Sequence, residues 1–425
     1  MDGVALILLF VVLMAMGVPV AVSLGLSGTI FVILQGLPIV VVAQRVGSYL
    51  LSFPLLAVTL FVLAGNIMNE SDVTTQLSKT AEILVGRMRG GLAHVNIIGS
   101  LIFAGMSGSA LADIGGLGKI EIETMTKSGY DKDVSAALTG ASSLVGPVFP
   151  PSIPLVIYAS LASVSATSCL IGGIIPSFLM VASLMLIVAY QAKKYNWPRC
   201  EQKWTMREKL KILGMAAPAI LSIFLLAGGL FSGFFSATEL GALCCCYVLL
   251  IGILFYRKLN LNSIVRAFRS TMRTVGSIMF VAGCASLYAL CLTMAGLPNQ
   301  VAAGILALSS NKYVILILIN IVLLITGMFM DTNAAQLILV PIFVPICKAA
   351  NIDLIHLGVI MCLNLMVGIL TPPVGTGLFL VSKVSNRPIN TIIPKLLPYY
   401  GALGAALLLI TFIPELVTWL PSVFA

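Results

Sequence analysis

Charge is scarce in this sequence, because Asp, Glu, Lys and Arg make up only 9% of its 425 residues. In a typical soluble domain these four residue types make up about 25%. Apolar residues account for 59% of the chain, and its mean hydropathy is +1.09. These values exclude an ordinary soluble enzyme. They indicate an all-α protein that crosses a membrane several times.

Sequence features of metal-dependent and ATP-dependent chemistry are also missing. The two histidines and nine cysteines do not have the spacing of metal ligands, and Cys244, Cys245 and Cys246 lie together in one apolar stretch. Thiols in such stretches usually pack as small apolar side chains. The chain has no G-x-x-x-x-G-K-[S/T] motif, so it is not predicted to hydrolyse ATP. We predict that the protein is not an enzyme.

The positive charges are confined to a few segments between the apolar runs. The net charge is +9, and residues 193–211 contain a dense group of lysines and arginines. Lys and Arg mark the cytoplasmic loops of membrane proteins. We therefore predict that residues 192–211 form a cytoplasmic connector, and that the basic charge reflects membrane topology rather than nucleic-acid binding.

Two apolar segments contain the same helix-breaking pattern. Val145–Pro151 and Val367–Pro373 each have a glycine followed by a Pro-Pro pair, and they lie 222 positions apart. The same offset superposes Gly105 on Gly327. Paired interruptions in a duplicated membrane fold are typical of secondary transporters, whose binding site lies where the two repeats meet. The sequence therefore predicts two repeats of inverted topology.

The two predicted repeats contain the same elements in the same order. Each repeat is predicted to include an arm, a helix that lies along the membrane surface. Positive charge is high on the first arm and nearly absent from the second, as opposite orientations of the two repeats require. The first repeat is predicted to span residues 1–191, with an arm at 71–94, a re-entrant hairpin at 95–118 and a broken helix at 134–160. The second is predicted to span residues 212–425, with an arm at 297–311, a hairpin at 313–346 and a broken helix at 354–380.

Main-chain carbonyls at the two breaks are the predicted cation ligands. A proline has no N–H and clashes with the carbonyl four residues before it. An unpaired carbonyl in hydrocarbon is costly, and a small hard cation such as Na⁺ can satisfy it. The carbonyls predicted to lose their helical partners are those of Gly146, Pro147, Gly368 and Ile369. Nearby hydroxyl groups that could complete the oxygen shells are those of Ser107, Ser109, Ser142, Ser143, Thr326 and Thr371.

The same region is predicted to bind an anionic substrate. The N-termini of half-helices carry free N–H groups and partial positive charge, which favour a carboxylate at the middle of the membrane. The predicted substrate lining consists of Ser143, Ser152, Asn333, Pro373 and Thr376.

Asp113 and Asp331 lie within the predicted hairpins and have two interpretations. Ionisable residues in membrane segments usually mark function, but an aspartate can also cap a short helix. The two residues do not align under the offset, because Asp331 aligns with Ser109. They are therefore not a symmetric pair, and proton coupling through them stays open as an alternative.

Four motifs in this order resemble those of a known transporter family. Leu63–Asn69, Phe103–Ala110, Gly146–Ser152 and Thr371–Gly375 are similar to segments of the large membrane subunit of tripartite ATP-independent periplasmic (TRAP) transporters, and the resemblance covers nearly the whole chain. It implies an elevator-type ion-transporter fold, in which a transport domain slides against a scaffold. It also implies Na⁺-coupled symport of an organic acid, such as sialic acid or a C4-dicarboxylate, across the bacterial inner membrane.

The resemblance further implies partners and at least two Na⁺ sites. The expected partners are a small four-helix membrane subunit and a periplasmic substrate-binding protein. The first Na⁺ site would use Ser107, Ser109, Gly146, Val148 and Pro150, and the second would use Gly327, Gly368 and Thr371. Val148 and Pro150 rest on the resemblance alone.

Two other functions stay open. A stand-alone carboxylate or ion carrier, coupled to Na⁺ or H⁺, would work without a soluble partner, and transport without any binding protein would identify it. An intramembrane hydrolase using Ser107 or Ser109 with His94 is a remote alternative. It is remote because these residues lie on one short segment and their spacing fixes no catalytic partner.

Overall fold

The computed structural model describes residues 2–71, 73–199, 205–308 and 311–424, and these ranges contain helices, turns and bends but no β-strand. The helices of the first half are α1 (Gly3–Ala15), α2 (Val20–Leu34), α3 (Val40–Leu50), α4 (Phe53–Glu70), α5 (Val73–Val85), α6 (Gly91–Ser107), α7 (Ala110–Gly116), α8 (Gly118–Lys127), α9 (Lys132–Ser143), α10 (Ile153–Ala162), α11 (Ala166–Gly172) and α12 (Ile174–Lys194). Those of the second half are α13 (Met206–Ser232), α14 (Ala237–Leu254), α15 (Leu261–Met294), α16 (Leu297–Leu308), α17 (Lys312–Phe329), α18 (Thr332–Ala349), α19 (Leu354–Leu370), α20 (Thr376–Ser385), α21 (Ile389–Phe412) and α22 (Glu415–Phe424). The predicted all-α membrane class is confirmed.

Several of the helices are long and apolar enough to cross a membrane. Seven such spans occur among the described residues, or eight if α3 and α4, which are bent by 52° relative to each other, form one span. The helices α10 and α20 contain only 10 residues each. A spanning helix needs about 20 residues, so these two helices each reach only part of the way across. The short helices are the second halves of the two interrupted segments.

The order of the elements repeats along the chain at the offset found in the sequence. Asp131 precedes α9 and Asp353 precedes α19, and these two positions differ by 222. Each aspartate side chain accepts hydrogen bonds from two backbone N–H groups of the helix that follows it, which is the usual N-cap arrangement. The two interrupted segments therefore begin with the same cap.

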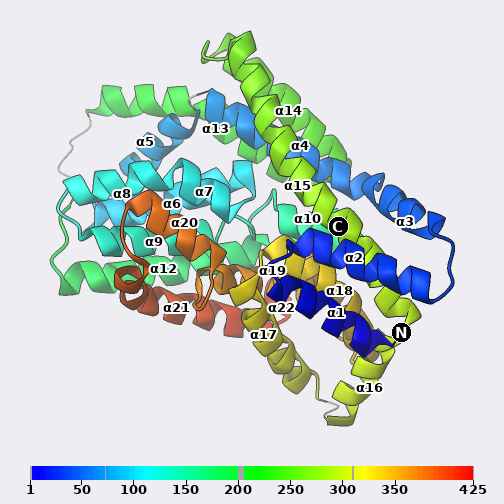
Figure 1. Ribbon diagram of the computed structural model, residues 1–425. Coiled ribbons are helices and arrows are strands. Elements are labelled where there is room, and N and C mark those ends of the chain that lie inside the picture. Colours follow the sequence, from blue (N-terminus) through cyan, green and yellow to red (C-terminus); the bar gives the residue numbers. More distant parts are fainter. Residues whose placement is uncertain (1, 72, 200–204, 309–310, 425) are drawn as a thin grey trace.

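The helices pack in two groups (Figure 1). In one group α4 packs against α14 and α15, and α2 and α3 pack against α15. In the other group α6 packs against α9, α17 packs against α19, and α9 and α12 both pack against α21. The short half-helices reach across to the other half of the chain, because α10 contacts α18 and α20 contacts α7. The two halves are thus interleaved at their interruptions.

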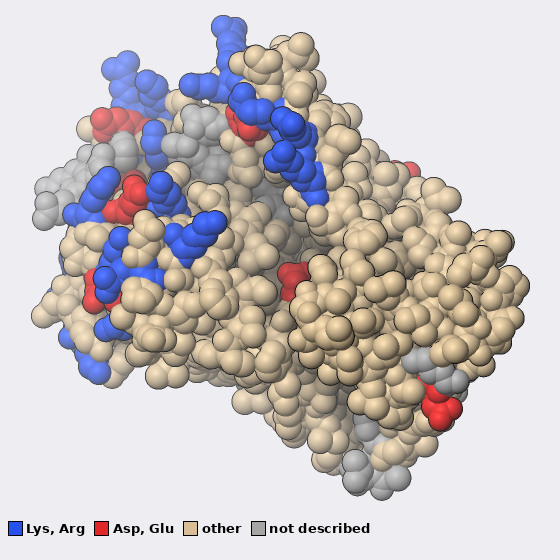
Figure 2. Space-filling view, in the orientation of Figure 1, with Lys and Arg blue, Asp and Glu red and all other residues tan. Residues whose placement is uncertain are grey.

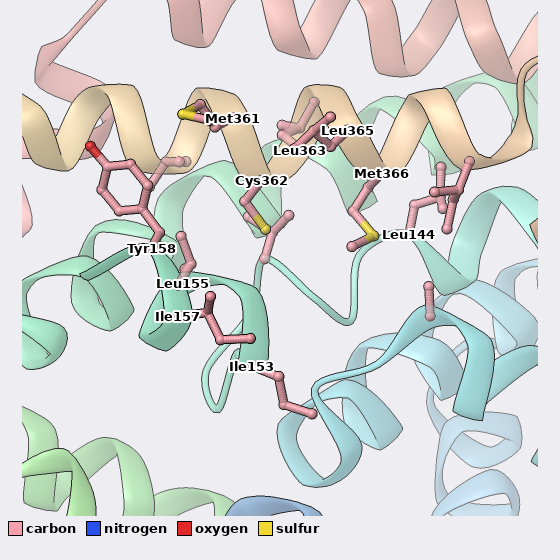
Figure 3. Close-up of a cluster of buried hydrophobic side chains, with 14 of the residues drawn as sticks. Leu144, Ile153, Leu155, Ile157, Tyr158, Met361, Cys362, Leu363, Leu365 and Met366 are labelled. Atoms are coloured by element: carbon pink, nitrogen blue, oxygen red, sulfur yellow. The ribbon is translucent and has the colours of Figure 1, made fainter. Parts of the chain in front are cut away.

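The contact between α10 and α19 is part of the apolar core (Figure 3). Leu155 and Tyr158 of α10 and Leu365 of α19 are fully buried. The ring of Tyr158 fills the space beside Gly358, where no side chain would fit, and its hydroxyl donates to the Leu354 carbonyl at 2.5 Å. This packing fixes the second half of one interrupted segment against the first half of the other.

The first hairpin extends further than the predicted range of 95–118. Its second arm consists of α7 and α8 and continues to Lys127, and residues 110–127 correspond at the 222 offset to α18, Thr332–Ala349. The charged side chains of Lys119 and Glu121 are typical of a loop at a membrane surface, but in the structure they belong to α8. In the predicted connector, α12 continues to Lys194 and α13 begins at Met206, while residues 200–204 lie outside the described part of the chain.

Candidate transport site

In the second half, the turn of the hairpin meets the interrupted helix. The helix α19 ends at Leu370, and the following Thr371 N–H donates to the Gly368 carbonyl at 2.8 Å. Gly368 lies directly against Gly327 of α17, since a Cβ atom on Gly368 would lie 2.7 Å from the Gly327 Cα. The Gly375 N–H donates to the carbonyl of Met328 at 2.9 Å. The structure therefore brings the three predicted ligands of the second Na⁺ site together.

In the first half the turn of the hairpin also lies against the interruption of a helix, and we call each of these two contacts a junction. The helix α9 ends at Ser143 and α10 begins at Ile153, with the interruption between them. Gly108, at the turn between α6 and α7, has φ +58° and lies against the carbonyl of Pro151. A side chain at Gly108 would be strained by this backbone conformation and would also collide with that carbonyl. Ser109 follows and caps α7, accepting from the Ala112 N–H at 3.4 Å.

The predicted ligands of the first Na⁺ site lie on both sides of this junction. Gly146, Val148 and Pro150 are buried within the interruption, where the Gly146 N–H donates to the Ser143 carbonyl at 3.2 Å. Ser107 is the last residue of α6, and its side chain lies outside the described part of the structure. The turn that contains Gly108 and Ser109 therefore lies beside the interruption, against Pro151.

Two carbonyls that were predicted to be unpaired accept hydrogen bonds in the structure. The carbonyl of Gly368 accepts from the Thr371 N–H, and that of Pro147 has two donors. The Pro147 carbonyl accepts hydrogen bonds from the Ser152 hydroxyl and, at 3.1 Å, from the Cys362 thiol. Figure 3 shows Cys362 projecting from α19 toward this segment. The Cys362 donor could not be predicted, because the effect of proline on a helix concerns residues of the same segment, whereas Cys362 lies 215 positions away.

A cavity of about 430 Å³ lies beside the two junctions. A hollow is visible near the middle of the space-filling view, between the positions of α7 and α15 (Figure 2). Polar side chains at the cavity are those of Asn66, Asn69, Ser109, Thr274, Ser277, Asp331 and Asn333. Among the described residues that line it, Asp331 is the only one with an ionisable side chain, and none is a lysine or arginine. The cavity thus joins both hairpins to α4 and α15.

The structure places one of the five predicted substrate residues at this cavity, namely Asn333. The other four are not among its described lining. Ser143 donates to the carbonyl of Gly140 at 2.7 Å, and Ser152 caps α10 by accepting from the Leu155 N–H at 3.1 Å. Pro373 is exposed, and the Thr376 hydroxyl is buried with no hydrogen-bond partner among the residues that the structure describes.

The two aspartates have different surroundings. Asp331 caps α18 by accepting from the Asn333 N–H at 3.0 Å, and it also lines the cavity. Asp113 of α7 is buried and is not among the described lining residues, and the structure shows no hydrogen bond between its carboxylate and any described side chain or backbone group. Both sequence interpretations of Asp331, as a cap and as a site residue, therefore remain compatible with its position.

A polar network connects α6, α8 and α9 near the first junction. Asn96 donates to Glu121 at 2.9 Å and to Thr139 at 2.7 Å, and it accepts from the Ser142 hydroxyl at 2.6 Å. Ser100 donates to Ser142 at 3.0 Å. Ser142, which sequence reasoning offered as a cation ligand, therefore holds neighbouring helices together in this structure.

Sequence reasoning missed the part of the cavity that α4 and α15 contribute. Asn66 and Asn69 are three positions apart on α4, as Thr274 and Ser277 are on α15. Residues three apart lie on the same face of a helix. Such polar pairs in otherwise apolar spans are the sequence signal for these residues, and they are independent of the helix-breaking pattern.

Comparison with known proteins identifies the family. The family model for the DctM component of the tripartite ATP-independent periplasmic transporter matches residues 7–416. The chain is 38% identical to the sialic acid TRAP transporter large permease protein SiaM of Vibrio cholerae, with 96% of each chain covered. It is 34% identical to the C4-dicarboxylate TRAP transporter large permease protein DctM of Pseudomonas aeruginosa, with 94% of each covered.

Other comparisons agree with this result. The chain is 37% identical to the sialic acid TRAP transporter permease protein SiaT of Haemophilus influenzae, covering 98% of this chain and 68% of that protein. The YdaH transporter of Alcanivorax borkumensis, a solved structure, has the same fold with a TM-score of 0.67 at 16% identity, covering 88% of this chain and 87% of its own. The multi-pass membrane chain therefore belongs to the family of large permease subunits, or DctM components, of tripartite ATP-independent periplasmic transporters.

Proposed function

We propose that this chain carries an organic acid together with Na⁺ across the bacterial inner membrane. In this proposal a periplasmic binding protein delivers the substrate and a small four-helix membrane subunit completes the transporter. Membership of the TRAP permease family supports the general activity and the need for partners. Sodium coupling is supported by the chemistry of the two junctions.

The main support for the proposal is that residues of both hairpins border the same cavity. Gly108 and Ser109 of the first junction and Asp331 and Asn333 of the second hairpin line one cavity. Na⁺ bound to the backbone oxygens beside this cavity would supply positive charge that its described side chains lack. A carboxylate would then be bound only when Na⁺ is present, and this is the coupling that symport requires.

The polar side chains of the cavity favour a hydroxylated monocarboxylate over a dicarboxylate. Asp331 accepts hydrogen bonds from hydroxyl groups, but it repels a second carboxylate. Amide and hydroxyl groups of Asn66, Asn333 and Ser277 can bind further substrate hydroxyls. Sialic acid has this combination of groups, and two of the relatives are named as sialic acid transporters.

An elevator movement is our proposal for how the site changes sides. The cavity lies between α4 and α15 on one side and the two hairpins on the other. The group containing α4, α14 and α15 would stay fixed as the scaffold. The hairpins and interrupted helices would move together, because the Gly327–Gly368 contact and the Met328–Gly375 hydrogen bond join them.

Reconstitution tests the proposal. Proteoliposomes containing this chain and its small membrane subunit would be supplied with radiolabelled sialic acid or succinate, with and without an inward Na⁺ gradient, and with a panel of periplasmic binding proteins. Uptake of sialic acid that requires both Na⁺ and a binding protein is the expected result. Uptake without any binding protein would instead identify the stand-alone carrier, and uptake driven by a proton gradient without Na⁺ would contradict sodium coupling.

A further inference from the structure

A second cavity lies between α5 and α13, separate from the transport site. It has a volume of about 270 Å³. Its lining residues, among those that the structure describes, are Gln76, Lys79, Glu208, Lys211, Ile212 and Met215, and none of them is among the described lining of the transport cavity. The two helices pack against each other along this cavity. The site therefore belongs to the contact between the amphipathic helix α5 and a membrane-spanning helix.

The cavity contains uncompensated positive charge. Lys79 and Lys211 are exposed, and neither takes part in the two ion pairs found among the described residues. The Glu208 carboxylate faces the start of α13 instead, where it accepts hydrogen bonds from the Thr205 N–H at 2.7 Å and the Thr205 hydroxyl at 2.8 Å. Among the described lining residues, two lysines thus outweigh one carboxylate that is already hydrogen-bonded. The site favours an anion.

The same cavity has an apolar wall. Ile212 and Met215 line it, and the side chains of Leu210 and Leu213 are exposed on the same part of α13. The helix α13 is long and apolar enough to cross the membrane. A ligand with an anionic head and apolar chains could contact both the lysines and the apolar wall. A small free anion would contact only the lysines.

The charge distribution assigns the cavity to the cytoplasmic leaflet. In Figure 2 the lysines and arginines gather on the side of the molecule where α5, α8 and the nearby end of α13 lie, and the opposite side is almost free of them. Basic residues mark the cytoplasmic side. Lys211 is five positions from the start of α13 at Met206, a rise of about 7 Å, so it lies near the level of lipid headgroups. Anionic lipids of the cytoplasmic leaflet bind basic sites of this kind.

We propose that the cavity between α5 and α13 binds the headgroup of an anionic phospholipid, with Lys79 and Lys211 at the phosphate and the acyl chains along Ile212 and Met215. The lipid bridges the two helices and so holds the α5 arm against α13, which packs on α14 of the scaffold. Phosphatidylglycerol is the probe that represents this class of lipid.

Native mass spectrometry of the full-length chain in detergent tests the proposal. The protein would be titrated with phosphatidylglycerol or with phosphatidylcholine of the same acyl chains. Lys79→Gln with Lys211→Gln is expected to weaken phosphatidylglycerol binding about tenfold and to leave phosphatidylcholine binding unchanged. The matched control is Lys127→Gln with Lys383→Gln, which removes the same charge from two exposed lysines elsewhere and should have no effect on either lipid.

A second variant, Glu208→Gln, is expected to change phosphatidylglycerol binding in the opposite direction. Glu208→Gln keeps an acceptor for the Thr205 N–H, so the start of α13 is preserved. It removes the negative charge from the cavity and should tighten phosphatidylglycerol binding. Equal losses in the test and control lysine pairs, or no response to Glu208→Gln, would overturn the proposal. Displacement of the lipid by sn-glycerol 3-phosphate at the same concentration as the lipid would identify a site for a free anion and would also overturn it.

Discussion

Gly327 and Gly368 lie backbone against backbone, so that a Cβ atom on Gly368 would collide with Gly327 and one on Gly327 would press closely against Gly368. A Cβ atom on Gly368 would lie 2.7 Å from the Cα of Gly327, and a Cβ atom on Gly327 would lie 3.0 Å from the Cα of Gly368. Distances below about 3 Å between such atoms require the backbone to move, because protein interiors are close-packed. This contact holds the tip of one hairpin against the interruption of α19, at the site proposed to bind Na⁺.

The first prediction concerns this contact. Gly368→Ala should separate α17 from α19, lower the free energy of unfolding by about 1–3 kcal/mol, as overpacking usually does, and abolish most Na⁺-dependent uptake. Thermal unfolding in detergent and uptake by proteoliposomes measure the two effects. Gly401→Ala is the control, because a Cβ atom there meets nothing within 4 Å and both quantities should stay near wild type. Normal uptake by Gly368→Ala would show that this close approach is not needed for transport.

The second prediction concerns the hydroxyl group at the same junction. Thr371→Ala should raise the Na⁺ concentration for half-maximal uptake about tenfold, the effect of losing one favourable oxygen contact to a charged group. Thr371→Ser should restore the wild-type value, because it keeps the hydroxyl. Sodium titration of uptake is the measurement.

The control for this prediction is Thr29→Ala on α2. The Thr29 hydroxyl donates to the Gly25 carbonyl at 2.7 Å, just as the Thr371 hydroxyl donates to the Val367 carbonyl at 2.8 Å. Both substitutions remove a hydroxyl that bonds to the residue four positions earlier, but Thr29 is not at a junction. Equal sodium responses of the two alanine variants would contradict a cation-binding role for Thr371.

How much of this site the sequence could predict depends on the kind of residue. Proline limits the backbone conformations of its segment and glycine allows additional ones, and both effects are independent of the rest of the fold. The interruptions after Ser143 and Leu370 could therefore be predicted from sequence alone. The contact of Cys362 with Pro147 could not, because it depends on how α19 packs against a segment distant in sequence. The contributions of Asn66 and Thr274 to the cavity also follow from helix packing.

The third prediction concerns the choice of substrate. Asp331→Asn should weaken binding of a hydroxylated monocarboxylate about tenfold or more, because hydrogen bonds to a charged carboxylate become weaker ones. The same change should strengthen inhibition of sialic acid uptake by succinate, since the repulsion of a second carboxylate is removed. Competition uptake assays measure both effects. Asparagine remains a good N-cap residue, so α18 should keep its start.

The matched control for Asp331→Asn is Asp353→Asn. Asp353 caps α19 through two backbone N–H groups but does not line the cavity. Its substitution should leave the competition between sialic acid and succinate unchanged. If both variants shifted substrate preference equally, helix capping rather than cavity chemistry would explain the result.

The last prediction concerns an ion pair that joins the two halves of the chain outside the membrane spans. Asp133 is largely buried at the start of α9, where its carboxylate accepts from Arg387 at 2.5 and 2.7 Å and from the Thr391 hydroxyl at 3.1 Å. The hydrogen bonds from Arg387 hold the pKa of Asp133 below its ordinary value. Because the pKa is lower in the folded state, the stability that this pair contributes is present above the ordinary carboxyl pKa of about 3.9 and is lost as the pH falls through the folded-state pKa.

Asp133→Asn should therefore lower the free energy of unfolding at neutral pH by about 1–3 kcal/mol, since Arg387 loses its charged partner. Thermal unfolding of both proteins across the pH range measures the difference between them. That difference should be constant from about pH 7 to pH 5 and should shrink below about pH 4, where the wild-type carboxylate also becomes protonated. Glu123→Gln, at an exposed position, should show no such difference at neutral pH. A difference for Asp133→Asn that does not change with pH would mean that side-chain shape, and not the charge on Asp133, stabilises this contact between the two halves.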